Sequence, residues 1–281
     1  MIPFDFDDCI FQSPNVVDRC CETKKTCHVC SAICTNNKCR QSLTSEYPFW
    51  LDALLDAPCS PPATQLEYSW SLTDHSNNIY IKKEDMLTLH RQREIGTTDA
   101  CRGRRGVSRG IHVWKITWPH DQRGTDAVIG VATENAPLYC VGYHSLVGDR
   151  TNQSWGWNIV RLFAIHNSCT RPYPSCPHDG DAKFLSKWYP KNIPDEVFMV
   201  LDMEEGSLSF VVNNRFLGNA FTGLQGRTLY PIISSVYGDS EVTLTYINGL
   251  MRKFPLSPLW LCDTFDVNLC KNNFGYLTWN N

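Results

Sequence analysis

The sequence lacks several features that would point to a function class at once. No apolar run reaches the roughly 18 residues that suggest a membrane-spanning helix. There is no excess of positive charge, because 26 Lys and Arg face 29 Asp and Glu, for a formal net charge of −3. The N-terminus carries Asp5, Asp7 and Asp8 where a signal peptide has basic residues and then an apolar stretch. These absences predict no nucleic-acid and no membrane partner, and they favour a cytoplasmic (cytosolic) location, with the nucleus as a further compartment.

Catalytic motifs are also missing. The chain contains no G-x-S-x-G, no H-E-x-x-H, no P-loop and no glycine-rich dinucleotide motif. One acidic stretch, VLDMEEGSLSF, places Asp202, Glu204 and Glu205 within four positions. Short apolar runs flank it, and Gly206 suits the turn of a hairpin. We therefore interpret these carboxylates as a solvated strand end and turn, and we predict a non-catalytic protein with no cofactor.

Cysteine, in contrast, is abundant: the chain has 14, and seven of them precede residue 40. Thiolates suit tetrahedral zinc, so Cys27, Cys30, Cys34 and Cys39 are one candidate ligand set. Their spacing matches no standard zinc finger. The alternative, a poorly ordered and disulfide-prone tail over residues 1–45, is the interpretation we favour, and we predict no metal site.

Short strand-like runs separated by Gly, Pro, Asn and Asp fill the chain from Trp70 to Tyr246. This pattern predicts an all-β fold, a sandwich or a barrel. A short helix is expected over Tyr47 to Asp56, and prolines after it should end it. Residues 168–195 are proline-rich and predict a long surface loop. The expected strands cover residues 78–81, 86–89, 111–118, 127–132, 198–202, 208–212, 232–236 and 242–246.

Four arginines lie within the eight residues Arg102 to Arg109. Such a segment is one pattern of RNA-binding proteins. The negative net charge argues against that interpretation.

Four longer blocks resemble a known family. Residues 103–136 read GRRGVSRGIHVWKITWPHDQRGTDAVIGVATENA, residues 154–157 read SWGW, residues 201–206 read LDMEEG and residues 226–231 read GRTLYP. Together they resemble the SPRY domain-containing SOCS box proteins, the Gustavus-like family, over about residues 50–250. The resemblance implies a bent, two-sheet antiparallel β-sandwich with a short preceding helix. It places that SPRY domain and its helix in residues 46–250.

The resemblance also implies a role. Family members are non-catalytic substrate receptors of cullin–RING ubiquitin ligases, which mark target proteins for proteasomal degradation. Their SPRY domain binds a short linear peptide with an acidic residue, an aliphatic residue and a run of Asn. Their SOCS box binds elongins B and C and a cullin scaffold.

Residue by residue, the resemblance assigns a peptide pocket to Arg91, Thr125, Tyr143, Leu146, Val236, Tyr237 and Gly238. Arg91 is expected to pair with the peptide acid, and Tyr143 to contact an Asn side chain. Without the resemblance, Tyr143, Leu146 and Val236 would be interpreted as sandwich packing. Arg93, Ile95 and Tyr237 depart from the family pattern, which has Pro, Ala and Trp there. A changed peptide preference, with more acid, is therefore expected.

The C-terminal residues 251–281 resemble the SOCS box only in part. Leu261 and Cys262 match its elongin-binding helix, whereas Pro258 and Asp266 replace aliphatic residues. This segment is interpreted as a divergent or truncated SOCS-box remnant. Two functions stay open: a ubiquitin-ligase receptor, and a peptide-binding scaffold that recruits no ligase.

Overall fold

A computed structural model describes residues 48, 50–149, 151–174, 193–251 and 278–279. The predictions for residues 1–45, including the cysteine ligand set, and those for Leu261 and Cys262 lie outside these described residues. Within them, no helix has the length and hydropathy that crossing a bilayer requires.

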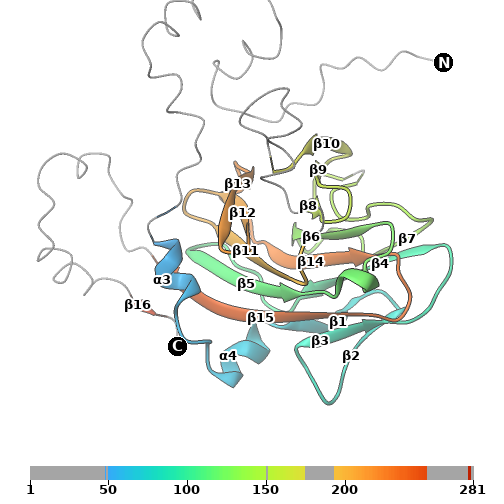
Figure 1. Cartoon of the computed structure of the whole chain (residues 1–281), viewed down its shortest axis with the longest axis horizontal. Helices are drawn as coiled ribbons and strands as arrows, with labels where there is room; N and C mark the ends of the chain where they lie inside the picture. Colours follow the sequence, from blue (N-terminus) through green and yellow to red (C-terminus); the bar gives the residue numbers. More distant parts are fainter. Residues whose placement is uncertain (1–47, 49, 150, 175–192, 252–277, 280–281) are drawn as a thin grey trace, which may run out of the picture.

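The described chain forms two antiparallel β-sheets that face each other (Figure 1). The first sheet has the strand order β1-β4-β14-β6-β8-β9-β10, and β7 pairs with the end of β4. Its strands are β1 (Trp70–His75), β4 (Thr97–Gly103), β6 (Ala127–Ala132), β7 (Tyr139–Val141), β8 (Ser154–Asn158), β9 (Phe163–His166), β10 (Cys169–Pro172) and β14 (Tyr230–Ser235).

The second sheet has the order β13-β12-β11-β5-β15-β3-β2, and β16 pairs with the far end of β15. Its strands are β2 (Ile79–Ile81), β3 (Thr88–Arg91), β5 (Ile111–Thr117), β11 (Glu196–Asp202), β12 (Ser207–Val212), β13 (Arg215–Phe221), β15 (Ser240–Met251) and β16 (Thr278–Trp279). The predicted all-β class and the antiparallel two-sheet sandwich are confirmed.

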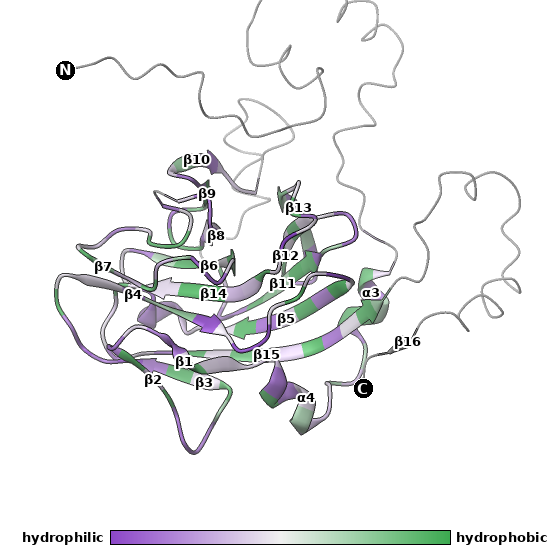
Figure 2. Ribbon diagram, turned by 180° about the vertical axis from the view of Figure 1, so that it is seen from behind, coloured by the Kyte–Doolittle hydropathy of each residue, from purple (hydrophilic) through white to green (hydrophobic). Residues whose placement is uncertain are grey.

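Strand β5 shows why this sequence buries both faces of its sheet. Successive side chains of a strand point to opposite faces. Trp114 and Ile116 enter the core between the sheets, whereas Ile111 and Val113 pack in a separate cluster against the helix α3 (Leu51–Leu55). Figure 2 shows hydrophobic and hydrophilic residues interleaved along β5. The helix is therefore part of the packed domain, because it covers apolar residues on the outer face.

The prolines after α3 do more than end it. The helix ends at Leu55, inside the predicted range, but a second helix, α4 (Pro62–Glu67), begins at one of those prolines. Proline is well tolerated in the first turn of a helix, where its missing N–H has no acceptor to lose. Gln65 of α4 then binds the backbone of Tyr246 through both ends of its amide, which fixes α4 to β15.

Other predictions need correction. The segment 168–195 is not loop throughout, because Cys169–Pro172 forms β10. The strand expected at 86–89 lies at Thr88–Arg91. The acidic turn is not fully solvated: Asp202 is buried, and its Oδ1 accepts the backbone N–H groups of Glu204 and Glu205 at 2.9 and 3.0 Å. Because its side chain holds the turn together, Asp202 has a structural role that the spacing alone did not reveal.

Candidate functional site

Four loops meet at one end of the sandwich and enclose a cleft of about 760 Å³. They are the β3–β4 loop, the segment that includes the short 3-10 helix η2 (His120–Gln122), the chain just after β7, and the β14–β15 turn. The lining residues are Arg93, Glu94, Ile95, Asp121, Gln122, Gly124, Thr125, Tyr143, Val236, Tyr237, Gly238 and Asp239. Five of the seven pocket residues assigned from the sequence, Thr125, Tyr143, Val236, Tyr237 and Gly238, therefore lie together.

The β3–β4 loop is tied to the chain after β7 by two hydrogen bonds. The backbone N–H of Gly96 donates to the Tyr143 hydroxyl oxygen at 2.9 Å. The N–H of Gly142 donates to the carbonyl of Gly96 at 2.7 Å. Tyr143 thus accepts a hydrogen bond from the protein and keeps its own O–H proton for a ligand. Its side chain is about half exposed (49%), so that proton is accessible from the cleft.

Two glycines allow the remaining loops to approach closely. A Cβ added at Gly238 would lie 2.9 Å from Cγ and 3.0 Å from Cα of Arg93. A Cβ at Gly124, where φ is +59°, would lie 3.0 Å from the Tyr237 side chain. Such distances are shorter than ordinary carbon contacts, so neither position accepts a larger residue without moving a wall of the cleft.

Arg91 does not line this cleft, and its expected role needs correction. Its side chain and that of Asp99 are both fully buried, and Arg91 Nη2 lies 2.8 Å from Asp99 Oδ2. The same guanidinium donates to the carbonyl oxygens of Gln92, Glu94 and Thr97 at 3.3, 3.1 and 3.1 Å. A guanidinium occupied in this way cannot reach a ligand in the cleft. Arg91 instead fixes the loop that carries Arg93, Glu94 and Ile95.

Leu146 is also absent from the cleft wall. It is buried (5% exposed) and packs with Ala100, Val128 and Ile165 on the outer face of the first sheet. The preceding residue, Ser145, donates to the carboxylate of buried Asp126 at 2.8 Å. Burial raises the pKa of Asp126, partly offset by this hydrogen bond. Leu146 therefore anchors the chain that carries Tyr143. This is the packing role that the sequence suggests for Leu146 without the family resemblance.

The charges around the cleft are unequal. Arg93 is its one lining cation, and no described residue forms an ion pair with it. Glu94, Asp121 and Asp239 are lining acids, and among the described residues only Asp239 has a basic side chain as neighbour, the imidazole of His90 with Nε2 at 3.8 Å. Because three carboxylates face one guanidinium, a strongly acidic ligand would meet repulsion on most sides. This geometry does not favour the expected preference for a peptide with more acidic residues. It leaves Arg93 as the group able to pair with one acidic residue.

The arrangement suits binding better than bond-making. The Gln122 side-chain oxygen accepts the N–H of Glu241 at 2.8 Å, which leaves its amide N–H groups for a ligand. Among the described residues, no group of three or more His, Cys, Asp or Glu side chains could hold a metal ion. The lining offers three hydroxyls, one amide, four charged groups and an apolar wall of Ile95, Val236 and the rings of two tyrosines. Such a surface selects a ligand by shape, hydrogen bonds and charge.

The arginines of residues 102–109 are partly committed to the fold. Arg102 is buried, and its guanidinium pairs with Asp74 and donates to the carbonyls of Thr133 and Ala136. Arg105 pairs with Glu67 and lies 5.1 Å from the ring centroid of Tyr68. Two of the four cations therefore hold the first sheet and α4 rather than standing free in solvent.

Comparison with known proteins identifies the domain. The SPRY domain family matches residues 111–248. Protein gustavus of Drosophila melanogaster is 46% identical over 218 residues, which cover 76% of this chain and 75% of that protein. The chain belongs to the SPRY domain-containing SOCS box protein family. Human SPRY domain-containing SOCS box protein 1 is 43% identical over 217 residues, covering 76% of each chain.

A further relative has a different box beside its SPRY domain, according to its name. F-box/SPRY domain-containing protein 1 of Drosophila grimshawi is 39% identical over 180 residues, covering 64% of this chain and 67% of that protein. Its name joins a SPRY domain to an F-box in place of a SOCS box.

Sequence reasoning missed part of the cleft. Glu94, Asp121, Gln122, Gly124 and Asp239 were not singled out, although each lies within four residues of one that was. The buried partner of Arg91 was missed too. The polar sequence of β4 gave no sign of it, because only the structure shows that all of Thr97–Gly103 is buried, where a carboxylate needs a partner.

Proposed function

We propose that the cleft binds a short linear peptide and that the chain acts as a non-catalytic substrate-recognition adaptor of a cullin–RING ubiquitin ligase. The observation that carries the first part is the convergence of Thr125, Tyr143, Val236, Tyr237 and Gly238 on one loop-lined cleft. Family membership supports the second part. The ligase link runs through elongins B and C to a cullin, and ubiquitinated targets pass to the proteasome from the cytosol or the nucleus.

The peptide carries one acid, an aliphatic residue and Asn side chains. Arg93 takes the acid, since its guanidinium has no ion-pair partner among the described residues and its Cα, Cβ and Cγ atoms lie against Gly238 in the cleft wall. Ile95 and Val236 contact the aliphatic residue. Tyr143 donates its hydroxyl proton to an Asn carbonyl, and Gln122 offers its amide to another peptide oxygen.

A double-mutant cycle tests this assignment. The probe is a blocked peptide of Asp, Ile and three Asn, compared by calorimetry with a copy in which Asp is replaced by Asn. Arg93→Ala should weaken the Asp peptide about two- to fivefold and leave the Asn copy unchanged, as an exposed ion pair of roughly 0.5–1 kcal/mol predicts. Arg104→Ala, outside the cleft, is the matched control. Equal losses for both peptides would remove Arg93 from the acid-binding role.

A second function, a peptide-binding scaffold without ligase recruitment, is favoured by one observation: Pro258 and Asp266 stand where the elongin-binding helix of the family has aliphatic residues. Affinity purification of the intact chain from cells separates the two functions. Recovery of elongins B and C with a cullin supports the ligase adaptor, and recovery of target proteins without them supports the scaffold.

A further inference from the structure

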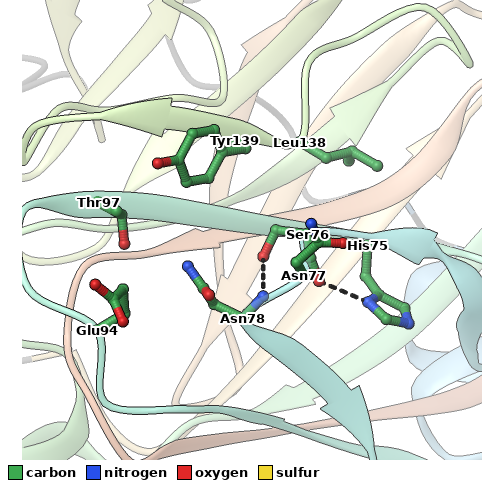
Figure 3. A pocket seen from close by; sticks show the side chains of 8 residues that line it. All are labelled: His75, Ser76, Asn77, Asn78, Glu94, Thr97, Leu138 and Tyr139. Carbon is green, nitrogen blue, oxygen red and sulfur yellow. Dashed lines mark hydrogen bonds between the residues drawn. The ribbon is translucent and has the colours of Figure 1, made fainter.

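A second cavity, of about 540 Å³, opens beside the cleft. Its lining residues are His75, Ser76, Asn77, Asn78, Glu94, Thr97, Leu138 and Tyr139. In Figure 3, Leu138 and Tyr139 lie across the cavity from Asn77 and Asn78, with Glu94 and Thr97 at one side. Glu94 also lines the cleft, so the two hollows share one wall.

Most polar groups of this cavity are already used by the protein. Both ring nitrogens of His75 face backbone carbonyls, at 2.8 and 3.1 Å. The Thr97 hydroxyl donates to Asp99 and accepts from Arg91. The Asn78 amide nitrogen donates to Asp99 Oδ1 at 3.0 Å. These groups shape the cavity but have little left to offer a ligand.

Three lining groups remain available. The amide of Asn77, the hydroxyl of Tyr139 and the carboxylate of Glu94 have no side-chain hydrogen bond with another described residue. Tyr139 is about half exposed (48%). Together these groups offer hydrogen-bond donors and acceptors beside the apolar side chain of Leu138. An amide side chain complements all three, because it carries a carbonyl acceptor and N–H donors on one planar group. A carboxylate would face Glu94, and an ammonium group offers no acceptor to the Tyr139 O–H or the Asn77 N–H groups.

The two hollows also share one support. The Arg91–Asp99 pair lies beneath the loop 92–97: Arg91 binds three of its carbonyls, and Asp99 binds Asn78 on the floor of the second cavity. A peptide that leaves the cleft past Glu94 reaches this cavity within a few residues, since an extended chain advances about 3.3 Å per residue.

We propose that the cavity between Asn77 and Tyr139 is a second subsite for the same linear peptide and takes an Asn or Gln side chain that flanks the segment held in the cleft. The proposal rests on the proposed peptide-binding function and extends its footprint across the loop 92–97. The subsite fixes the register of the peptide, because the distance between the flanking amide and the cleft residues must match the width of that loop.

Selection from a phage-displayed library of random peptides against the full chain tests this subsite. The chains compared are wild type, Asn77→Ala/Tyr139→Phe, and Tyr80→Phe, an exposed tyrosine that lines neither hollow. Wild-type and Tyr80→Phe selections should enrich peptides with an amide residue at a fixed distance from the cleft-binding segment. The double variant should lose that preference and keep the rest. Each hydrogen bond should contribute about two- to tenfold in affinity.

Calorimetry on the enriched peptide then gives the decisive comparison. Replacing its flanking amide residue with Ala should weaken binding to wild type and to Tyr80→Phe by about two- to tenfold or more, and leave binding to Asn77→Ala/Tyr139→Phe unchanged. A peptide that binds all chains equally with or without the amide overturns the second subsite and leaves the cleft intact. A library that yields no enriched peptide on any chain overturns the peptide-binding function, and the subsite with it.

Discussion

Removing the Arg91 guanidinium distinguishes two roles for this residue: support of the loop 92–97, and direct contact with a ligand. In Arg91→Met the carboxylate of Asp99 stays buried, with only the Thr97 hydroxyl and the Asn78 amide as partners. Breaking one side of a buried ion pair costs about 3–5 kcal/mol because it leaves an uncompensated charge. Urea denaturation should show a loss of that size, with a lower midpoint and an unchanged slope.

A second substitution should restore the stability of the fold but should not restore the order of the loop 92–97. In Arg91→Met/Asp99→Leu the buried charge is gone, and well-packed apolar replacements of buried ion pairs are often neutral or stabilising. The carbonyls of Gln92, Glu94 and Thr97 still lack their donor. A loosened loop has to be ordered on binding. We expect near-native stability and peptide affinity lowered by about tenfold, worth roughly 1.4 kcal/mol.

The matched control is Arg93→Met, which removes an exposed cation two residues away. Its stability should stay within about 0.5 kcal/mol of wild type, as for most surface changes. Two results would refute the reasoning. Native affinity in Arg91→Met/Asp99→Leu would show that the loop needs no internal guanidinium. Native stability with lost binding in Arg91→Met would show that Arg91 contacts the peptide after all.

Three further predictions concern other parts of the sandwich. Burial lowers the pKa of His112 to about 4. The unfolded chain takes up that proton near pH 6.5, so the free energy of unfolding should fall by roughly 3 kcal/mol between pH 6.5 and 4. His112→Gln should flatten this acid limb in urea titrations, and an unchanged limb would contradict the assignment. Gly238→Ala should displace Arg93, so we expect a loss of peptide affinity with a melting temperature close to that of wild type. A lowered melting temperature with unchanged affinity would show that this glycine has only a structural role. Glu204→Gln keeps an acceptor for the N–H of Gly110, now at 2.7 Å, and should cost under about 1 kcal/mol, whereas Glu204→Ala should cost about 1–2 kcal/mol in thermal melts.

The strands could be predicted where their chemistry is local. The run from Ile111 to Thr117 alternates and ends in turn residues, so its pattern alone specifies a strand. Strands β8, β9 and β13 were missed because their stability comes from partners distant in sequence. In β8, Trp155 and Trp157 pair with His166 and Ala164 of β9, and Gly156 interrupts any local pattern. Pairing of this kind overrides residue preference.

The site residues, too, could be predicted only in part. Transfer by resemblance found residues such as Tyr143 and Gly238 that lie on the cleft wall, because family likeness preserves position in the chain. It failed for Arg91 and Leu146, because the direction of a side chain depends on the local backbone and on what covers that face of the sheet. In β3, Arg91 follows His90, which remains partly exposed. One step along a strand reverses the face, so a pocket-lining residue and a buried one can be neighbours in sequence.

Strand β15 begins at Ser240, directly after the cleft residue Asp239, and runs for 12 residues to Met251. At about 3.3 Å per residue it spans roughly 40 Å, with one irregularity between Tyr246 and Asn248. It therefore acts as a rigid spacer. Asp239 and Met251 are held about the length of this strand apart, at its two ends. Substitutions in the cleft loops leave that separation unaltered, because pairing with β5 and β3 fixes the strand along its length.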